Sequence, residues 1–182
     1  MEKEGDRRAV RTKNALKNAM LAQMKRKDIS RITVSELADA ADVGRGTFYL
    51  HYADPYDLLD KIEDELVGKI TEYTSPVINH MDNESLLTHL ENIWRYIFEN
   101  METFKVLMGP GYRGRFMEKF KIKCIESVIV SLGGAELKQA ELYSIIYVVS
   151  GTLGIYERWM EEGPSAPPDQ VARIIRNLIV GR

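Results

Sequence analysis

The sequence contains a single cysteine, no long hydrophobic run and almost no net charge. Because Cys124 has no second cysteine in the chain, an intramolecular disulfide is excluded and a reducing compartment is the simpler expectation. The longest uncharged stretch, Leu142 to Tyr156, has 15 residues, whereas a helix needs about 20 residues to cross a bilayer. Residues Met1 to Arg11 are charged and lack the apolar core of a secretory signal. We therefore expect a cytoplasmic protein without a membrane partner.

Side chains arranged for catalysis or metal binding are also lacking. The three histidines, His51, His80 and His89, have no metal-ligand spacing with one another or with Cys124. Cys124 itself lies in an apolar row with a four-residue step, which is typical of a packed helix. No pair of carboxylates is set apart by an apolar environment. The sequence therefore predicts neither an enzyme nor a metal or cofactor site.

The small net charge of −2 hides an uneven distribution along the chain. Residues Met1–Tyr52 hold 11 Lys and Arg against 7 Asp and Glu, and Ala53–Arg182 hold 14 against 20. The first part therefore carries +4 and the second −6. A cationic end on an acidic body attracts a polyanion locally. A solvated surface with extra lysines explains the counts better on its own, so the charge needs a motif beside it.

Helical periodicity is what the chain has in abundance. Apolar residues recur at spacings of three and four along most of the sequence, and only Ser127–Leu132 also fits a strand. We predict an all-α protein with a first domain over residues 1–53 and a second over residues 54–182. A helix from residue 54 to about residue 73 connects the two domains.

Two short helices joined by a tight turn stand out near the N-terminus. Thr33-Val34-Ser35-Glu36 has the spacing of a capping box, in which Thr and Glu each satisfy a backbone N–H of the other. Asp42 falls at the turn, and Asp is one of the few non-glycine residues that adopt the left-handed conformation. Residues 43–52 then form a second helix, with Phe48 and Tyr52 directed inward. This pattern predicts a helix-turn-helix whose second helix enters the DNA major groove.

The TetR/AcrR family of bacterial transcriptional regulators has a DNA-binding signature that residues 33–52 closely resemble, TVSELADAADVGRGTFYLHY. The resemblance extends over about residues 8–66. It implies a three-helix DNA-binding domain attached to a variable helical domain for ligand binding and dimerisation. Two features depart from the family pattern: Asp42 replaces a usual glycine, and Ala53 and Pro55 replace lysines that bind phosphate in many members.

The resemblance, carried across residue by residue, implies a set of DNA contacts. Tyr49 and His51 fall on positions that face phosphates, although a capping or pH-sensitive role stays open for His51. Arg45 begins the second helix, where its guanidinium binds either guanine O6 and N7 or a phosphate. Because Ala53 and Pro55 carry no positive charge, we expect a basic arm to supply more of the backbone contacts. The predicted DNA-binding residues are Arg45, Thr47, Tyr49, His51, Thr33, Arg7, Arg8 and Arg11, with Lys13 and Lys17 as further candidates.

The C-terminal part holds most of the aromatic residues and the most apolar helix. These aromatic side chains either line an effector pocket between helices or form an ordinary helical core. The pocket candidates are Trp94, Phe98, Phe116, Phe120, Tyr143 and Tyr147. In the family that the N-terminal part resembles, the last two long helices form a four-helix dimer interface, and Gly151 and Gly154 allow close approach here. The interface candidates are Ile145, Val149, Leu153, Ile175 and Leu178.

The predicted function is that of a homodimeric repressor that binds a near-palindromic operator in double-stranded DNA. An unidentified small-molecule effector releases it. The loop from Gly109 to Gly114, followed by Phe116, resembles one C-terminal subgroup of the family. Some members of that subgroup are coregulators or activators controlled by a protein partner, which is the alternative function. A closed apolar cavity of a few hundred cubic ångströms favours the small molecule.

Overall fold

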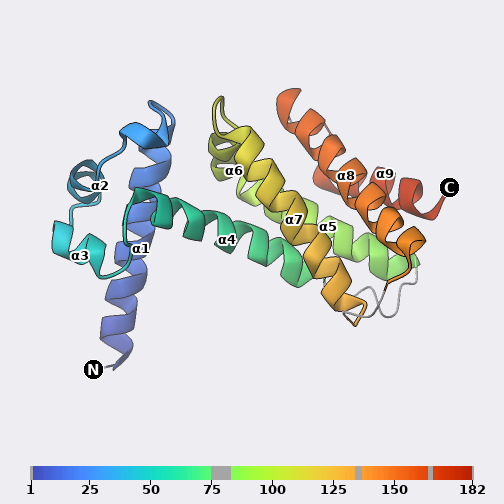
Figure 1. The fold of residues 1–182 in the computed structure, drawn as a ribbon, viewed down its shortest axis with the longest axis horizontal. Helices are drawn as coiled ribbons and strands as arrows, with labels where there is room; N and C mark the ends of the chain where they lie inside the picture. The colour runs from blue at the N-terminus through green and yellow to red at the C-terminus, as the bar shows by residue number, and fades with distance from the viewer. Residues whose placement is uncertain (1, 75–82, 134–136, 164–165, 182) are drawn as a thin grey trace. The chain divides into compact units, whose positions relative to one another are not determined.

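The computed structural model describes residues 2–74, 83–133, 137–163 and 166–181, and Figure 1 draws their fold as a ribbon. Within these ranges the regular secondary structure is entirely helical, as the periodicity predicted. His80, named above among the histidines, lies outside the described residues. No helix in the described ranges is long and apolar enough to span a membrane.

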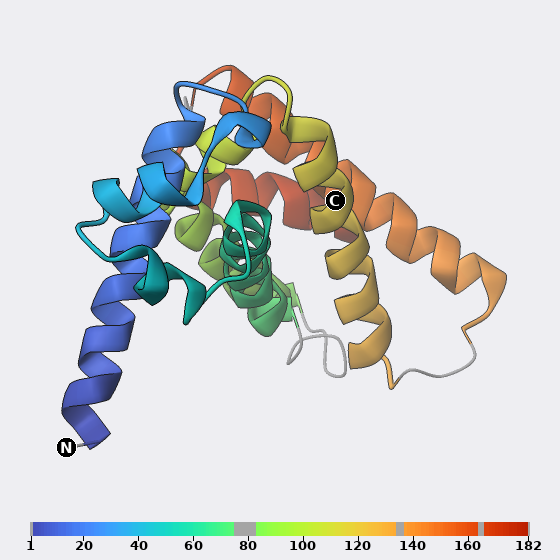
Figure 2. The same ribbon diagram turned by 60° about the vertical axis from the view of Figure 1, so that its left-hand side comes forward.

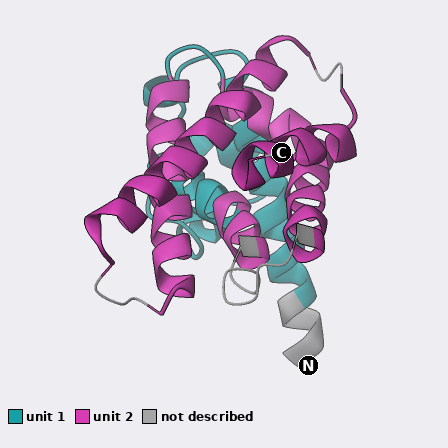
Figure 3. Ribbon diagram, turned by 90° about the vertical axis from the view of Figure 1, so that its right-hand side faces the viewer, with its two compact units in different colours: residues 1–65, 109–111 teal, residues 66–108, 112–182 magenta. Residues whose placement is uncertain are grey.

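The chain divides into two compact units, which Figure 3 colours separately. Unit 1 consists of Met1–Glu65 with Gly109–Gly111, and unit 2 consists of Leu66–Met108 with Tyr112–Arg182. The division falls inside α4 (Pro55–Thr74), which agrees closely with the connecting helix expected from the sequence. The sequence placed the domain boundary earlier, between residues 53 and 54, because it took the start of the helix as the end of the first domain.

Unit 1 is a small helical domain built around one apolar core. Besides the first part of α4, its elements are α1 (Glu2–Met24), the short 3-10 helix η1 (Ile29–Arg31), α2 (Val34–Ala40) and α3 (Arg45–Tyr49). Each of the α-helices contributes to the core through side chains that are fully or almost fully buried. These core residues are Leu16, Met20, Leu37, Phe48, Leu58 and Ile62.

Unit 2 contains the remaining helices. They are α5 (Asn83–Glu99), α6 (Met101–Leu107), α7 (Arg113–Ser131), α8 (Gln139–Glu161) and α9 (Pro168–Val180). Helix α9 packs against α5 and α7 packs against α8, and both pairs can be followed in Figure 2. Arg113, at the start of α7, donates to Glu157 at 3.3 Å and to Glu161 at 2.5 Å, which ties α7 to the C-terminal end of α8.

Aromatic rings form the centre of unit 2. Trp94 of α5 lies edge-on to Tyr156 and Trp159 of α8, with ring centroids 6.2 and 5.2 Å apart. Phe104 of α6 and Phe120 of α7 pack against the same Tyr156, at 5.8 and 6.1 Å. Edge-to-face pairs of this kind are favourable beyond their buried area. The cluster therefore joins α5, α6, α7 and α8 in one core.

Candidate nucleic-acid interface

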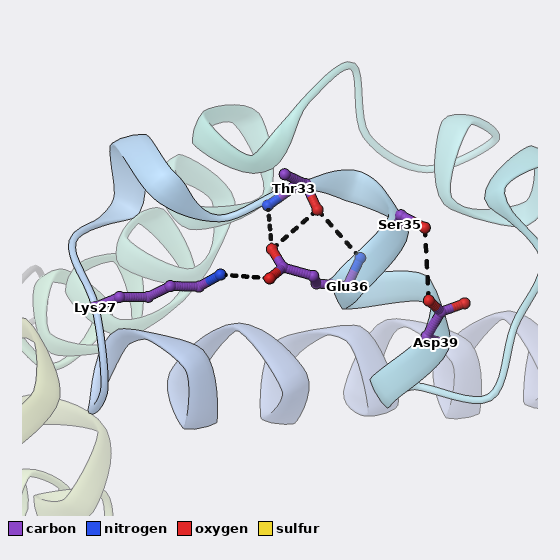
Figure 4. Close-up of polar contacts among 5 residues, drawn as sticks. All are labelled: Lys27, Thr33, Ser35, Glu36 and Asp39. Atoms are coloured by element: carbon purple, nitrogen blue, oxygen red, sulfur yellow. Dashed lines mark hydrogen bonds and ion pairs between the residues drawn. The ribbon is translucent and has the colours of Figure 1, made fainter.

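Helix α2 begins at a capping box, as the sequence predicted, and Figure 4 shows its hydrogen bonds. The Glu36 backbone N–H donates to Thr33 Oγ1 at 3.3 Å, and the Thr33 backbone N–H donates to Glu36 Oε2 at 2.9 Å. Helix termini leave backbone N–H groups without partners, and the box satisfies two of them. The start of α2 is thereby fixed at Thr33.

A lysine outside α2 strengthens this cap. Lys27 Nζ donates to Glu36 Oε1 at 2.6 Å from the segment that follows α1 (Figure 4). This bond, together with those from Thr33, lowers the pKa of Glu36 to about 2. The carboxylate is therefore charged at neutral pH and holds the segment after α1 against the N-terminus of α2.

The turn between α2 and α3 depends on Asp42. Its φ of 53° lies in the left-handed region, as the sequence predicted for this position. A short polar side chain tolerates this conformation better than other non-glycine residues do. Because the chain reverses within a few residues here, α3 can pack its Phe48 into the core that Leu37 of α2 also fills. The two short helices therefore form the expected helix-turn-helix.

The residues of α3 and of the short segment that follows it, up to Tyr52, separate into a buried and an exposed set. Phe48 and Tyr52 are buried, which confirms their predicted place in the core. Tyr49 is exposed, with its ring edge-on to Phe48 at a centroid distance of 5.6 Å. Arg45 is also exposed, and Thr47 and His51 are half-buried. Side chains with hydrogen-bond donors therefore remain wholly or partly accessible on α3 and just after it.

The other predicted DNA contacts lie on α1 and at the start of α2. Arg7, Arg8 and Arg11 are exposed on α1. Thr33 is exposed, but its hydroxyl already serves the capping box. Lys17 donates to Glu65 at 3.2 Å, so this further candidate is held by an ion pair within unit 1.

Sequence reasoning gave no role to Leu50, which follows α3 and is 80% exposed. A large apolar side chain on the surface beside Tyr49 fits the methyl group of thymine, which only the major groove presents. The signal was present in the sequence. Phe48 and Tyr52 already supply the inward positions of this short segment, which leaves the residue between Tyr49 and His51 facing outward.

Unit 2 contains a cavity of about 360 Å³ lined by residues of all its long helices. Trp94 and Phe120 of the predicted pocket set line it. The other four candidates do not, and their assignment is corrected here. Phe116 is buried among Phe104 and Phe120, and the exposed residues Phe98, Tyr143 and Tyr147 lie on the surface. Tyr143 accepts a bond from Gln139 of its own helix at 2.9 Å, so its hydroxyl finds a partner outside the cavity.

The predicted dimer-interface residues are also placed differently. Ile145, Val149 and Leu153 line the cavity, and Ile175 is buried, whereas Leu178 is 65% exposed. Within this chain, the side of α8 that carries Ile145, Val149 and Leu153 therefore faces the cavity. Helix α8 is apolar on more than one side, so its periodicity shows a helix but not which side faces the core. In the described part of the chain, no three His, Cys, Asp or Glu side chains come together as metal ligands.

Comparison with known families covers both units. Residues 18–62 match the family described as bacterial regulatory proteins, tetR family. Residues 84–181 match a family described as transcriptional regulator C-terminal region. The second match alone spans more than half of the chain.

Individual relatives agree with these families. The uncharacterized HTH-type transcriptional regulator YxbF of Bacillus subtilis (strain 168) is 25% identical over 169 residues, which cover 90% of this chain and 43% of the relative. The chain thus spans less than half the length of this curated relative.

Two solved structures share the fold. The dihydroxyacetone kinase operon activator DhaS aligns with a TM-score of 0.63 and 18% identity, covering 93% of this chain and 94% of that chain. The TetR transcriptional regulator from Streptococcus agalactiae 2603V aligns with a TM-score of 0.65 and 19% identity, covering 98% and 99%.

Proposed function

The chain belongs to the TetR family of bacterial transcriptional regulators, and we propose that it binds an operator in double-stranded DNA as a homodimeric repressor. The observation that carries this proposal is the helix-turn-helix of α2 and α3, with Arg45 and Tyr49 exposed on α3. We place its action in the cytoplasm, where the DNA is, and propose that it acts without enzymatic chemistry or a cofactor.

Contacts to phosphates and to bases would come from different elements. The exposed arginines Arg7, Arg8 and Arg11 of α1 suit the phosphate backbone, which accounts for most of the sequence-independent affinity. Arg45 suits guanine, because its guanidinium matches O6 and N7 together. Tyr49 and His51 offer donors at the end of rigid aromatic bodies, and Leu50 adds an apolar contact.

A dimer explains the outer side of α8. Tyr143 and Tyr147 are exposed there, one helical turn apart, and the exposed glycines Gly151 and Gly154 continue the same stripe. A Cβ atom at either glycine would meet nothing within 4 Å, so a second copy can approach the backbone closely. Ile174 and Leu178 of α9 are exposed as well. We assign these residues to the dimer interface in place of the inward-facing candidates.

Release from DNA is proposed to follow ligand binding in unit 2. The cavity of about 360 Å³ falls in the size range of small-molecule sites, although it opens to the surface and is not fully closed. Such a ligand shifts the population only if it binds the released conformation more tightly. Helix α4 belongs partly to each unit and is the continuous element through which a change in unit 2 can reach unit 1.

The test is a DNA titration with an operator selected from a randomised duplex pool using the unmodified protein. We expect Arg45→Ala to weaken operator binding 10- to 100-fold and to relax base preference at one position, because a bidentate arginine contact contributes about 1–3 kcal/mol. Removing Arg7, Arg8 and Arg11 together should weaken all duplexes and flatten the salt dependence.

Arg158→Ala is the matched control, since Arg158 is an exposed arginine of α8 paired with Glu162 in unit 2. It should bind the operator like the unmodified protein. Unchanged operator affinity in both Arg45→Ala and Tyr49→Ala, with the dimer intact, would show that α3 does not contact DNA.

A further inference from the structure

A second pocket lies in unit 1, between α1 and the start of α4. Its volume is about 240 Å³, and all of its lining residues belong to unit 1. They come from residues 10–17 of α1, from residues 61–65 of α4 and from Tyr52 in the segment between α3 and α4. Lys17 of α1 donates to Glu65 of α4 at 3.2 Å, and the two helices meet in Figure 1. An ion pair thus joins the two helices that form the pocket.

Positive charge predominates in the lining of this unit 1 pocket. Lys13, Lys17 and Lys61 line it together with one acidic residue, Glu65, which gives a net charge of +2. The other acidic side chains of residues 53–65 do not line the pocket. Lys17 is paired with Glu65, whereas Lys13 makes no ion pair within the described part of the chain. Lys61 pairs with Asp57 at 3.3 Å, but its side chain is 58% exposed and its ammonium group has further N–H donors. Lys13 and Lys61 are therefore available to an anion.

The phenol hydroxyl of Tyr52 is an unused donor at the same pocket. Tyr52 is 7% exposed, and its hydroxyl makes no hydrogen bond within the described part of the chain. Its Oη keeps accessible surface, unlike the phenol oxygen of Tyr156, which is fully buried. Burial and the carboxylates of Glu65 and Asp57 raise the pKa of Tyr52, so the phenol keeps its proton at neutral pH. Polar groups on buried residues are almost always hydrogen-bonded, so this donor points to a missing acceptor in the pocket.

We propose that the unit 1 pocket binds a small molecule that ends in a phosphate monoester group, held by Lys13, Lys61 and the Tyr52 hydroxyl. A monoester carries close to two negative charges at neutral pH and has three acceptor oxygens, which matches the charge and the donors of the lining. A phosphate of the DNA backbone carries one charge and has a sugar on each side, so it fits a donor on a buried residue less well. The inference does not depend on the proposed function.

An NMR titration of the full ¹⁵N-labelled chain, without DNA, tests this site with two probes of similar shape. Methyl phosphate carries about two charges at pH 7.5 and methanesulfonate carries one, and both are added at constant ionic strength. Shifts confined to the backbone amide signals of residues 10–17, 52 and 61–65 report binding in the pocket. We expect methyl phosphate to bind at least about 5-fold more tightly than methanesulfonate, because its second charge also lies beside the lysines.

Two lysines of α4 provide the matched pair that locates the site. Lys61 and Lys69 are both exposed and both paired with a carboxylate of their own helix, but Lys69 does not line the pocket. Lys61→Gln should weaken methyl phosphate binding about 3- to 10-fold, since a charge-assisted hydrogen bond is lost, and Lys69→Gln should leave it unchanged. Tyr52→Phe keeps the ring, removes the donor and should weaken binding about 3-fold. Thermal unfolding identifies a folding defect, and if Tyr52→Phe does not fold, the two lysine variants decide the site.

The same variants separate a free phosphate ester from the DNA backbone. We expect Lys61→Gln and Tyr52→Phe to bind the operator like the unmodified protein. If both instead bind every duplex more weakly and methyl phosphate causes no shifts in the pocket, the pocket holds a backbone phosphate and the inference is wrong. Equal binding of the two probes, or equal losses in Lys61→Gln and Lys69→Gln, would also overturn it, since either result shows only non-specific attraction. A chain that binds methyl phosphate but no duplex refutes the regulatory function and leaves the pocket standing.

Discussion

His89 links the burial of one side chain to the pH dependence of folding. Its folded-state pKa is about 4, against an ordinary value of 6.5, and burial is the cause. Between these values the unfolded chain binds the proton and the folded chain does not. The stability of the folded state is therefore unaffected by His89 above pH 6.5. It decreases as the pH falls from 6.5 to 4, and the decrease stops below about pH 4.

The expected loss between pH 7 and pH 4 is about 3 kcal/mol, taking roughly 1.4 kcal/mol for each pKa unit. Urea unfolding at pH 7.5, 6 and 5 measures its upper part. Protonation of Glu36 destabilises the folded protein only below about pH 4.5, because its pKa is lowered from that value to about 2. Measurements between pH 5 and 7 therefore report on His89 and not on Glu36. His89→Leu should flatten the slope between pH 5 and 7. An unchanged slope in this variant would mean that another group titrates.

Single residues also show what a sequence reveals. The inward positions of Phe48 and Tyr52 and the left-handed Asp42 follow from local spacing, and each is found as expected. Leu50 was given no place in the sequence analysis, and the structure leaves it on the surface. Tyr143 and Tyr147 were placed inside because polar-tipped aromatics suit pockets. Whether such a side chain points in or out depends on what packs against its helix, which the sequence does not state.

At the scale of the element, α2 depends on its cap. The helix has only seven residues, so a lost hydrogen bond at its N-terminus affects a large part of it. Thr33→Val keeps the branched shape but removes the hydroxyl that accepts from the Glu36 N–H. We expect a loss of about 1 kcal/mol in the free energy of unfolding, measured by urea denaturation.

Thr33→Ser is the control, because serine caps helices as well as threonine does. It should restore stability, and it also separates the two roles given to Thr33. If the serine variant is as stable as the unmodified protein but binds the operator more weakly, the threonine contacts DNA in addition to capping α2. Equal stability of the valine variant would show that the Lys27–Glu36 pair holds the segment without the cap.

The start of a helix can be predicted where the sequence has proline at the first helical position. Pro168 is the first residue of α9, and Pro55, directly after Asp54, is the first residue of α4. Helix α1 extends to Glu2, well before the apolar face that gave the sequence signal. The charged first turns have no hydrophobic periodicity, so nothing in the pattern marked them as helical. Helix α6 begins directly after Asn100, so only one residue separates it from α5 and no loop signal in the sequence marks the boundary.

On the scale of the whole molecule, the charge division does not follow the two compact units. The excess of positive charge lies in Met1–Tyr52, the segment that contains the helix-turn-helix, and most of the excess negative charge of the remainder lies in residues 53–65, at the start of α4. A net charge of −2 alone would have argued against a DNA partner. Salt screens the interaction between charges that are more than about 10 Å apart. DNA bound at α3 would therefore interact mainly with the charges close to this helix and not with the net charge of the protein.

Dimerisation should control operator affinity through the number of half-sites held at once. Tyr147 is 78% exposed on α8 and Leu178 is 65% exposed on α9. An aspartate at either position would bring two like charges together in a symmetric interface and desolvate them. We expect the double variant Tyr147→Asp, Leu178→Asp to be monomeric at micromolar concentration, as measured by light scattering after size-exclusion chromatography.

The monomer should lose at least about 100-fold in affinity for a duplex with both half-sites, since the second contact is no longer intramolecular. Affinity for a single half-site should not change, because α3 is untouched. Val130→Asp places the same charge on an exposed valine of α7 and should remain dimeric. If the double variant stays dimeric, the two copies meet through another surface. If it becomes monomeric yet keeps full operator affinity, the operator has a single half-site and the palindromic arrangement is wrong.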